Sequence, residues 1–306
     1  MSLFSLIAAL LLEHFRPLSN RSPIFVSFTR YAHYLERHLN AGQILHGVVA
    51  WCLAVLLPAL LTGAIYAVLY QINLTLAWMF GAAIVYLTVG LRYFSAPAES
   101  LAGALRDNDP IRARKHLAHW SGRSTDEWDS TTLARVGIEH TLALSHKHLF
   151  GVIVWFVVLG PAGAVFYRLA QVVGQKWGGL DEYEFGQFGH FAAQVFEWVD
   201  WLPLRLTALS FAIVGDFEDA VYCWRTQAES WAQHGIGIVL ASGAGALGVR
   251  LGEPLPVGGE VEFRAELGLG DDADADYLQS TVSLIWRAAV LWLALISLFT
   301  VATWVA

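Results

Sequence analysis

The sequence predicts an all-α protein, a polytopic integral membrane helical bundle that also carries amphipathic interfacial helices. Of its 306 residues, 56% are hydrophobic and only 15% are charged, and the mean hydropathy is +0.49. Soluble domains are usually about 25% charged. The 13 Trp and 10 Tyr residues suit the water–lipid interface, where amphipathic rings gather. The predicted partner is therefore the lipid bilayer, and a net charge of -7 argues against nucleic acid.

The N-terminal apolar stretch, residues 3–12, is too short to span a bilayer comfortably. It has no basic region before it and no small-residue cleavage pattern, so we expect a half-buried or re-entrant helix ending at Glu13 rather than a signal peptide. Residues 13–43 are polar and basic, with apolar positions at roughly helical spacing. They predict an amphipathic helix at a membrane face. The arginines of this segment are Arg16, Arg21, Arg30 and Arg37.

Two apolar runs, residues 44–70 and 74–91, are each predicted to cross the bilayer, since about 20 helical residues span a hydrocarbon core of roughly 30 Å. Because only residues 71–73 separate them, the second run must return to the starting side. Pro58 lies inside the first run, where a kink is tolerated if neighbouring helices satisfy the freed carbonyl. A last crossing is expected at residues 285–304.

A long polar segment, residues 92–148, follows the hairpin. It holds eight of the 19 Lys and Arg residues within 57 positions. Positively charged loops stay on the cytoplasmic side, so we expect this basic helical segment in the cytoplasm. The predicted organisation is a single multi-pass domain, residues 1–306, in a bacterial inner (plasma) membrane.

The central apolar run, residues 149–173, is expected to be the third crossing. A Gly160-Pro161-Ala162-Gly163 turn interrupts it, and Arg168 is its single charge. Residues 190–214 predict a weaker fourth crossing. The region 215–284 that follows is polar, with twelve acidic side chains against three arginines. The side of the membrane on which it lies depends on whether residues 190–214 cross.

Ionisable side chains make residues 190–214 a weak span and also a candidate site. Charges at membrane depth are costly unless they face a partner or a wet cavity, which singles out Glu197, Asp200 and Arg205. Pro203 must bend or break a helix there, and a guanidinium recognises anions in a planar, bidentate manner. The alternative is a structural ion pair or an interfacial loop, because the acids occur in a Trp-rich string, EWVDW, typical of an interfacial belt.

The cytoplasmic arginines Arg112, Arg114 and Arg123 could hold phosphate or anionic lipid head groups. The positive-inside rule explains the same charges without a ligand. The histidines near Glu139 are more widely spaced than zinc ligands usually are, so no metal site is predicted. The chain contains no nucleotide-binding P-loop, nucleophile elbow or H-E-x-x-H motif.

Four strings of the sequence carry a family resemblance. In order, they are ALRDNDPIRARKHLAHWSGRSTDEWDSTTLARVGIE, GVIVWFVVLGPAGAVFYRLAQ, DWLPLRLTAL and GALGVRLGE. They resemble the adenosylcobinamide-phosphate synthase family of cobalamin biosynthesis (CobD/CbiB), and the resemblance covers nearly the whole chain. It implies an inner-membrane protein that joins adenosylcobyric acid, a corrinoid, to an aminopropanol phosphate through an amide bond. ATP and Mg would be its cofactors if the synthase activity is retained.

The resemblance also implies roles for individual residues. Acid–base or other catalytic roles fall on Glu139, Glu197 and Asp200, with Glu197 able to bind a metal or to act in proton transfer. Arginines would bind the phosphate or propionate groups of the substrates. These implied substrate-binding residues are Arg112, Arg114, Arg123, Arg168 and Arg205.

Several family motifs are replaced in this chain. HTLALSHKHLFG follows Glu139 where the family has an acidic, Asn-rich stretch, QVVGQKWG replaces N-T-L-D-S-M, and Asp200 stands where Asn is usual. Losing such polar groups removes acid–base and metal-binding capacity. The chain is also similar to the AmpE branch of the superfamily, which is linked to regulation of β-lactamase induction. A non-catalytic membrane sensory or regulatory protein is therefore the alternative.

Overall fold

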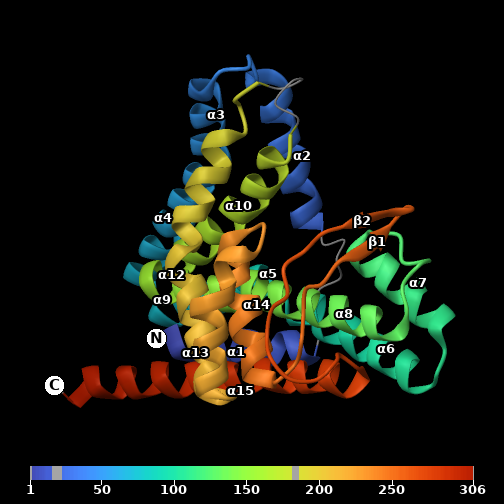
Figure 1. Ribbon diagram of the computed structural model, residues 1–306. Helices are drawn as coiled ribbons and strands as arrows, with labels where there is room; N and C mark the ends of the chain where they lie inside the picture. Colours follow the sequence, from blue (N-terminus) through green and yellow to red (C-terminus); the bar gives the residue numbers. More distant parts are fainter. Residues whose placement is uncertain (1, 16–22, 181–185, 306) are drawn as a thin grey trace. The chain divides into compact units, whose positions relative to one another are not determined.

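The computed structural model describes residues 2–15, 23–180 and 186–305, which leaves Arg16 and Arg21 outside the described residues. Most of the chain is helical (Figure 1). One short antiparallel hairpin, β1 (Leu255–Val257) with β2 (Glu260–Glu262), is the sheet among the described residues. The predicted all-α class is confirmed. Contacts divide the chain into unit 1, residues 1–90 and 147–202, and unit 2, residues 91–146 and 203–306.

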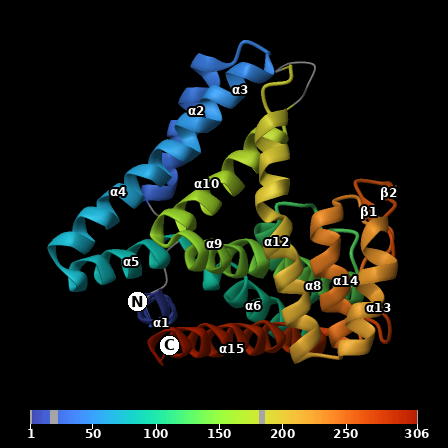
Figure 2. The ribbon, with the colours of Figure 1, turned by 90° about the vertical axis from the view of Figure 1, so that its left-hand side faces the viewer.

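Unit 1 contains a long apolar hairpin, whose two arms are the helical segments before and after Asn73. Asn73 turns the chain between its two arms and caps the second one, accepting a hydrogen bond of 2.7 Å from the Thr75 N–H. Figure 2 shows the two arms meeting at this turn. The helices up to this point are α1 (Ser2–Phe15), α2 (Pro23–Leu39), α3 (Ile44–Trp51), the π-helix η1 (Cys52–Leu56), α4 (Leu57–Ile72) and α5 (Leu74–Thr88).

The central apolar run is divided at the Gly160-Pro161-Ala162-Gly163 turn. It is split into α9 (Gly151–Leu159) and α10 (Pro161–Gly178), which pack against each other. Gly160 separates them with φ 63° and ψ -150°, a conformation that essentially only glycine adopts. Pro161 then starts α10, because its missing N–H costs nothing at the first helical position. Hydropathy does not register this break.

The core of unit 1 gathers aromatic rings from several segments. Trp51, Trp177 and Phe188 are buried together with the small residues of α3 and η1. The last helix to enter this unit is α12 (His190–Val214), which continues into unit 2 after Leu202. Pro203 lies inside α12 without ending it, so of the bend or break expected at this position the break is not observed.

Unit 2 is built from shorter helices and one long terminal helix. Asp109, Asp129 and Asp216 cap three of its helices by accepting hydrogen bonds from backbone N–H groups. The terminal helix α15 packs against α6 and α8, and α13 packs against α14. Its elements are η2 (Leu91–Tyr93), α6 (Ser95–Arg106), α7 (Pro110–Ser121), α8 (Ser130–Ser145), α13 (Phe217–Gln227), η4 (Ala228–Ser230), α14 (His234–Leu247), β1, β2 and α15 (Ala275–Val305). The π-helix η3 (His146–Phe150) joins α8 to α9.

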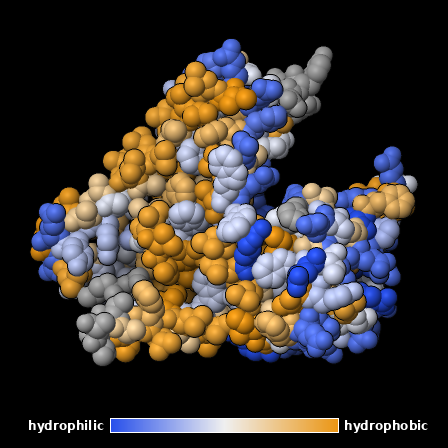
Figure 3. Space-filling view, turned by 60° about the vertical axis from the view of Figure 1, so that its left-hand side comes forward, coloured by the Kyte–Doolittle hydropathy of each residue, from blue (hydrophilic) through white to orange (hydrophobic). Residues whose placement is uncertain are grey.

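Four helices of the described residues are long and apolar enough to cross a membrane: Ile44–Ile72, Leu74–Arg106, Ser130–Leu159 and Ala275–Ala302. Figure 3 shows hydrophobic residues crowding the surface over α3 and α4, where Leu60 is 69% exposed. Such surfaces suit lipid rather than water, and the chain is a membrane protein. The third of these helices shares residues 149–159 with the expected 149–173 span and starts inside the segment 92–148. Helix α12, the weak predicted span, is not among the four.

Candidate functional site

One face of α8 carries a row of polar side chains. Thr132, Arg135 and Glu139 lie three and four residues apart, which places them on the same side of a helix. Arg135 and Glu139 are each only 6% exposed, and both lie in the candidate crossing Ser130–Leu159. A buried charge requires a partner. We therefore expect another segment of the chain to supply opposite charges to this face of α8.

That segment is the chain after α14. Gly248 ends α14 in the left-handed conformation, with φ 68°. The chain then pairs with a later stretch through the bridges Val249 to Asp271 and Leu251 to Leu267, so it folds back on itself between them. Glu253 has a φ of 64°, which is uncommon for a residue with a side chain. Such strained positions cluster at functional sites.

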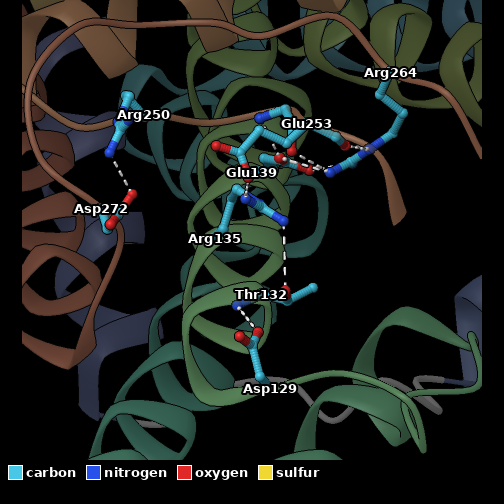
Figure 4. Close-up of polar contacts among 9 residues, drawn as sticks. Asp129, Thr132, Arg135, Glu139, Arg250, Glu253, Arg264 and Asp272 are labelled. Carbon is cyan, nitrogen blue, oxygen red and sulfur yellow. Dashed lines mark hydrogen bonds and ion pairs between the residues drawn. The ribbon is translucent and has the colours of Figure 1, made fainter. Parts of the chain in front are cut away.

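Glu139 and Arg264 form the centre of the site (Figure 4). The Arg264 guanidinium donates from Nη1 to Glu139 Oε2 at 2.7 Å and from Nη2 to Oε1 at 3.2 Å. The Gly252 N–H donates to the same Oε1 at 2.8 Å, and Arg264 also donates to the carbonyls of Gly252 and Glu253. The Trp231 ring lies 5.4 Å from the Arg264 guanidinium carbon, at cation–π distance.

Arg135 and Glu253 form a second ion pair beside the first. Together with Glu139 and Arg264 they make a group of two acids and two arginines, here called the charged cluster. Arg135 Nη2 lies 3.4 Å from Thr132 Oγ1, and Arg135 Nε is buried with no hydrogen-bond partner among the described residues. The charged cluster is thus electrically balanced but retains one unused donor, which can serve a water molecule or an anion.

The arrangement limits what Glu139 does chemically. Both of its carboxylate oxygens already accept hydrogen bonds from the chain, so neither can bind a substrate or a metal without losing one of them. Glu139 therefore acts as an anchor that holds the loop of Gly252 and Arg264 on α8. The strained Glu253 is positioned through that anchor.

Asp129 fixes the start of α8 and gives a prediction. Hydrogen bonds from the side chain and backbone N–H of Thr132 hold the pKa of the Asp129 carboxyl below its ordinary value. We expect Asp129→Ala to lower the free energy of unfolding at pH 7 by about 1 kcal/mol. Since the folded pKa is depressed, this contribution is present above the unfolded pKa and disappears as pH falls through the folded value.

The measurement is thermal unfolding of the purified chain in detergent at neutral and acidic pH. The control is Asp129→Asn, which retains a capping oxygen without the charge, so it should keep part of the parent's stability at pH 7 and show no pH-dependent loss from this position. A stability gap between parent and Asp129→Ala that grows on acidification would contradict this account.

The predicted cytoplasmic arginines have separate structural partners. Arg112 Nη1 lies 3.3 Å from Asp107 Oδ2 in an exposed pair, and Arg123 Nη1 lies 3.1 Å from Glu262 Oε2. Arg114 Nε donates to the Trp128 carbonyl at 3.0 Å. The three are not brought together in one site by any contact that the structure describes.

Two other predicted residues fall in unit 1. Asp200 is 5% exposed, and its Oδ1 accepts a hydrogen bond of 2.8 Å from Tyr167, which is fully buried. Arg168, the residue after Tyr167, is partly buried and donates a hydrogen bond to Gln171. Gly151 makes room for this arrangement, since a Cβ there would lie 2.1 Å from the Tyr167 ring. The Tyr167–Asp200 pair is thus a buried polar contact in an apolar helix bundle, a typical mark of function in membrane proteins.

Glu197 and Arg205 take different positions. Glu197 is exposed on α12 within unit 1, whereas Arg205 is partly buried on the same helix within unit 2. No ion pair between them is described. Within residues 2–15, 23–180 and 186–305, no group of three or more His, Cys, Asp or Glu side chains could hold a metal ion.

Sequence reasoning missed Arg264, Arg135, Glu253 and Trp231. Arg264 is one of three arginines in the acid-rich region 215–284, and nothing in the sequence distinguishes it from Arg225 and Arg250 as the one with a buried partner. Arg135 was counted only as one of the basic residues of segment 92–148. The string GALGVRLGE did identify the segment with Gly252 and Glu253, although spacing alone did not show that it meets Glu139.

Comparisons with known proteins identify the family of the chain. The family model described as "CobD/Cbib protein" matches residues 6–285. The chain belongs to the CobD/Cbib family. It is 37% identical to "Cobalamin biosynthesis protein CobD" of Stutzerimonas stutzeri, over 96% of each chain. It is 38% identical to the protein of that name from Chromobacterium violaceum, over 70% of this chain and 68% of the relative. No solved structure gives a significant match.

Within this CobD/Cbib chain, two stretches that carry the family resemblance meet at the charged cluster. The first contains Glu139 on α8, and the second, GALGVRLGE, contains Gly252 and Glu253. The Gly252 N–H to Glu139 bond joins them directly.

Proposed function

We propose that this chain is an inner-membrane enzyme of cobalamin biosynthesis that forms the amide bond between adenosylcobyric acid and an aminopropanol phosphate. The observation that carries the proposal is the similarity to proteins named "Cobalamin biosynthesis protein CobD", which covers 96% of both chains in one case and about two thirds in another. Four helices long and apolar enough to cross a membrane support the location. The corrinoid substrate and the inner membrane follow from the same proposal.

The proposed bond joins a carboxyl carbon of the corrinoid to the amine nitrogen of the aminopropanol phosphate, and one carboxylate oxygen leaves with two protons of the ammonium group as water. Both substrates carry anionic groups, so the chain needs cations to hold them. Arg168, partly buried beside Tyr167 and Asp200, is the arginine that we propose for a phosphate or propionate group. Bidentate geometry suits a guanidinium to that role.

We propose Asp200 as the carboxylate that accepts a proton from the amine in unit 1, because the Tyr167 hydroxyl holds it in one orientation. Glu197 is a weaker candidate, since it is exposed and no hydrogen bond or ion pair of its side chain is described with the residues that the structure covers. Glu139 becomes a positioning residue instead, because both of its oxygens are already used. Arg205, Arg112, Arg114 and Arg123 remain candidates for anion binding.

The family resemblance implies ATP and Mg, and the residues fit them poorly. Mg²⁺ bound with a nucleotide uses one or two carboxylates, but the buried acids Glu139 and Asp200 are already paired within the chain. The described residues also contain no cluster of metal-binding side chains. We therefore derive no step through either group.

A gene deletion tests the proposal. In a cobalamin-making host with no other synthase, deleting this gene should abolish conversion of adenosylcobyric acid, and a plasmid copy should restore it. A copy with Arg168→Gln should convert at least about tenfold less, since a lost hydrogen bond to a charged group costs about 1.5–3 kcal/mol. Arg225→Gln, an exposed arginine of α13, should behave as the parent. Unimpaired conversion in the deletion strain would remove the enzymatic proposal.

A further inference from the structure

The apolar face of helix α2 packs against the core of unit 1. Ala32 is fully buried and Leu35 is 6% exposed, and both belong to the core that contains Trp51 and Trp177. An interfacial helix normally binds a membrane by inserting its apolar face. This helix cannot do so, and any contact with lipid must come from its other side.

The outward face of α2 is cationic and aromatic. Glu36, the acid among the described residues of this helix, points inward, where it lies 3.5 Å from Lys176 Nζ and 3.4 Å from His33 Nδ1. Arg30 and Arg37 are exposed and have no ion-pair partner among the described residues. The exposed side chains on this face are Arg30, Tyr31, His33, Tyr34, Arg37 and His38.

The tyrosines of this face suit a water–lipid boundary. Tyr34 is 57% exposed, and its ring centroid lies 4.0 Å from that of His38. Tyr31 is 36% exposed and donates to the Leu53 carbonyl at 3.3 Å, which fixes α2 against η1. Tyrosine is enriched at the depth of phospholipid head groups.

The length of the neighbouring helix sets the depth of α2. The helix Ile44–Ile72 has 29 residues and is therefore about 43 Å long, which exceeds a hydrocarbon core of roughly 30 Å by about 13 Å. That excess corresponds to about nine residues. The Tyr31 to Leu53 bond and the path of α2 beside α3 (Figure 2) place α2 beside the first ten residues of the helix Ile44–Ile72, at its N-terminal end. We propose that the outward face of α2 binds the anionic head groups of phospholipids.

The test follows hydrogen–deuterium exchange of α2 in the full-length protein, with one copy of the chain in each nanodisc. Exchange of the α2 amides should slow about fivefold or more when phosphatidylglycerol is mixed into phosphatidylcholine, since each arginine near an anionic surface contributes about fivefold in binding. The difference should shrink in high salt. In Arg30→Gln/Arg37→Gln it should disappear.

A matched control removes two exposed cations elsewhere. Lys115→Gln/Arg225→Gln loses the same charge from α7 and α13 and should keep the full lipid effect. Equal exchange in both lipid mixtures for the parent protein would overturn the proposal. So would slowing by free glycerol phosphate in discs of phosphatidylcholine alone, or protection that appears only when a disc holds two copies, because these results would assign the face to a soluble phosphate or to a second chain.

Discussion

Replacing Arg264 with alanine should lower the free energy of unfolding by about 3–5 kcal/mol, because it leaves the Glu139 carboxylate buried without its cation. Arg264 supplies two of the three hydrogen bonds that Glu139 accepts, and it also donates to the carbonyls of Gly252 and Glu253. The loop should detach from α8 as a consequence. Thermal or denaturant unfolding in detergent measures the loss, and protease cleavage between residues 249 and 270 should accelerate.

Arg250→Ala is the matched control. Arg250 lies in the same loop and forms a pair of 2.6 Å with Asp272, but both side chains are exposed. Exposed pairs contribute only about 0–1 kcal/mol. The double variant Glu139→Gln/Arg264→Gln should recover part of the loss, since no unpaired buried charge remains. The cluster account is wrong if Arg264→Ala destabilises no more than Arg250→Ala.

Gly163→Ala should destabilise the α9–α10 hairpin of unit 1 by about 3 kcal/mol. A Cβ at position 163 would lie 1.9 Å from the Trp155 carbonyl oxygen and 2.8 Å from Leu159 Cβ. Both contacts involve the preceding helix, and a backbone carbonyl cannot move aside as a flexible side chain can. The variant forces α10 away from α9, and unfolding midpoints of the purified protein would report the change.

Gly103→Ala provides the comparison for that prediction. Gly103 lies within α6, and a Cβ there would meet nothing within 4 Å. Alanine is favoured over glycine in a helix by about 0.5–1 kcal/mol, so this variant should be slightly more stable than the parent. If Gly163→Ala matched Gly103→Ala, then α9 and α10 would not pack as closely as the structure describes.

The limits of an apolar helix can be predicted from the sequence where particular residues end or cap it. The Gln71-Ile72-Asn73 turn ends one apolar helix and Asn73 caps the next, so the limits of this hairpin could be read from the sequence. The region 149–173 could not be treated in this way. Its apolar content is continuous, while the feature that divides it is the backbone conformation of Gly160, which hydropathy does not contain. The GPAG string was visible, but it was interpreted only as a kink.

The residues of the candidate site could likewise be predicted only in part. Glu139 and Asp200 were singled out from the sequence, and both are buried and hydrogen bonded. The partner Arg264 was missed because it lies 125 positions from Glu139, and no periodicity links two segments across such a distance. Arg112, Arg114 and Arg123 share a positive charge but have separate structural partners, which composition alone cannot reveal.

Amide formation by the purified protein tests the central claim most directly. The full-length chain in nanodiscs is supplied with adenosylcobyric acid, aminopropanol phosphate, ATP and Mg²⁺, and the corrinoid is analysed by mass spectrometry. We expect a product whose mass equals that of the two substrates less one water, with much less product from Arg168→Gln and parent levels from Arg225→Gln. Unchanged adenosylcobyric acid with a folded parent protein would contradict the assignment of this chain as a synthase.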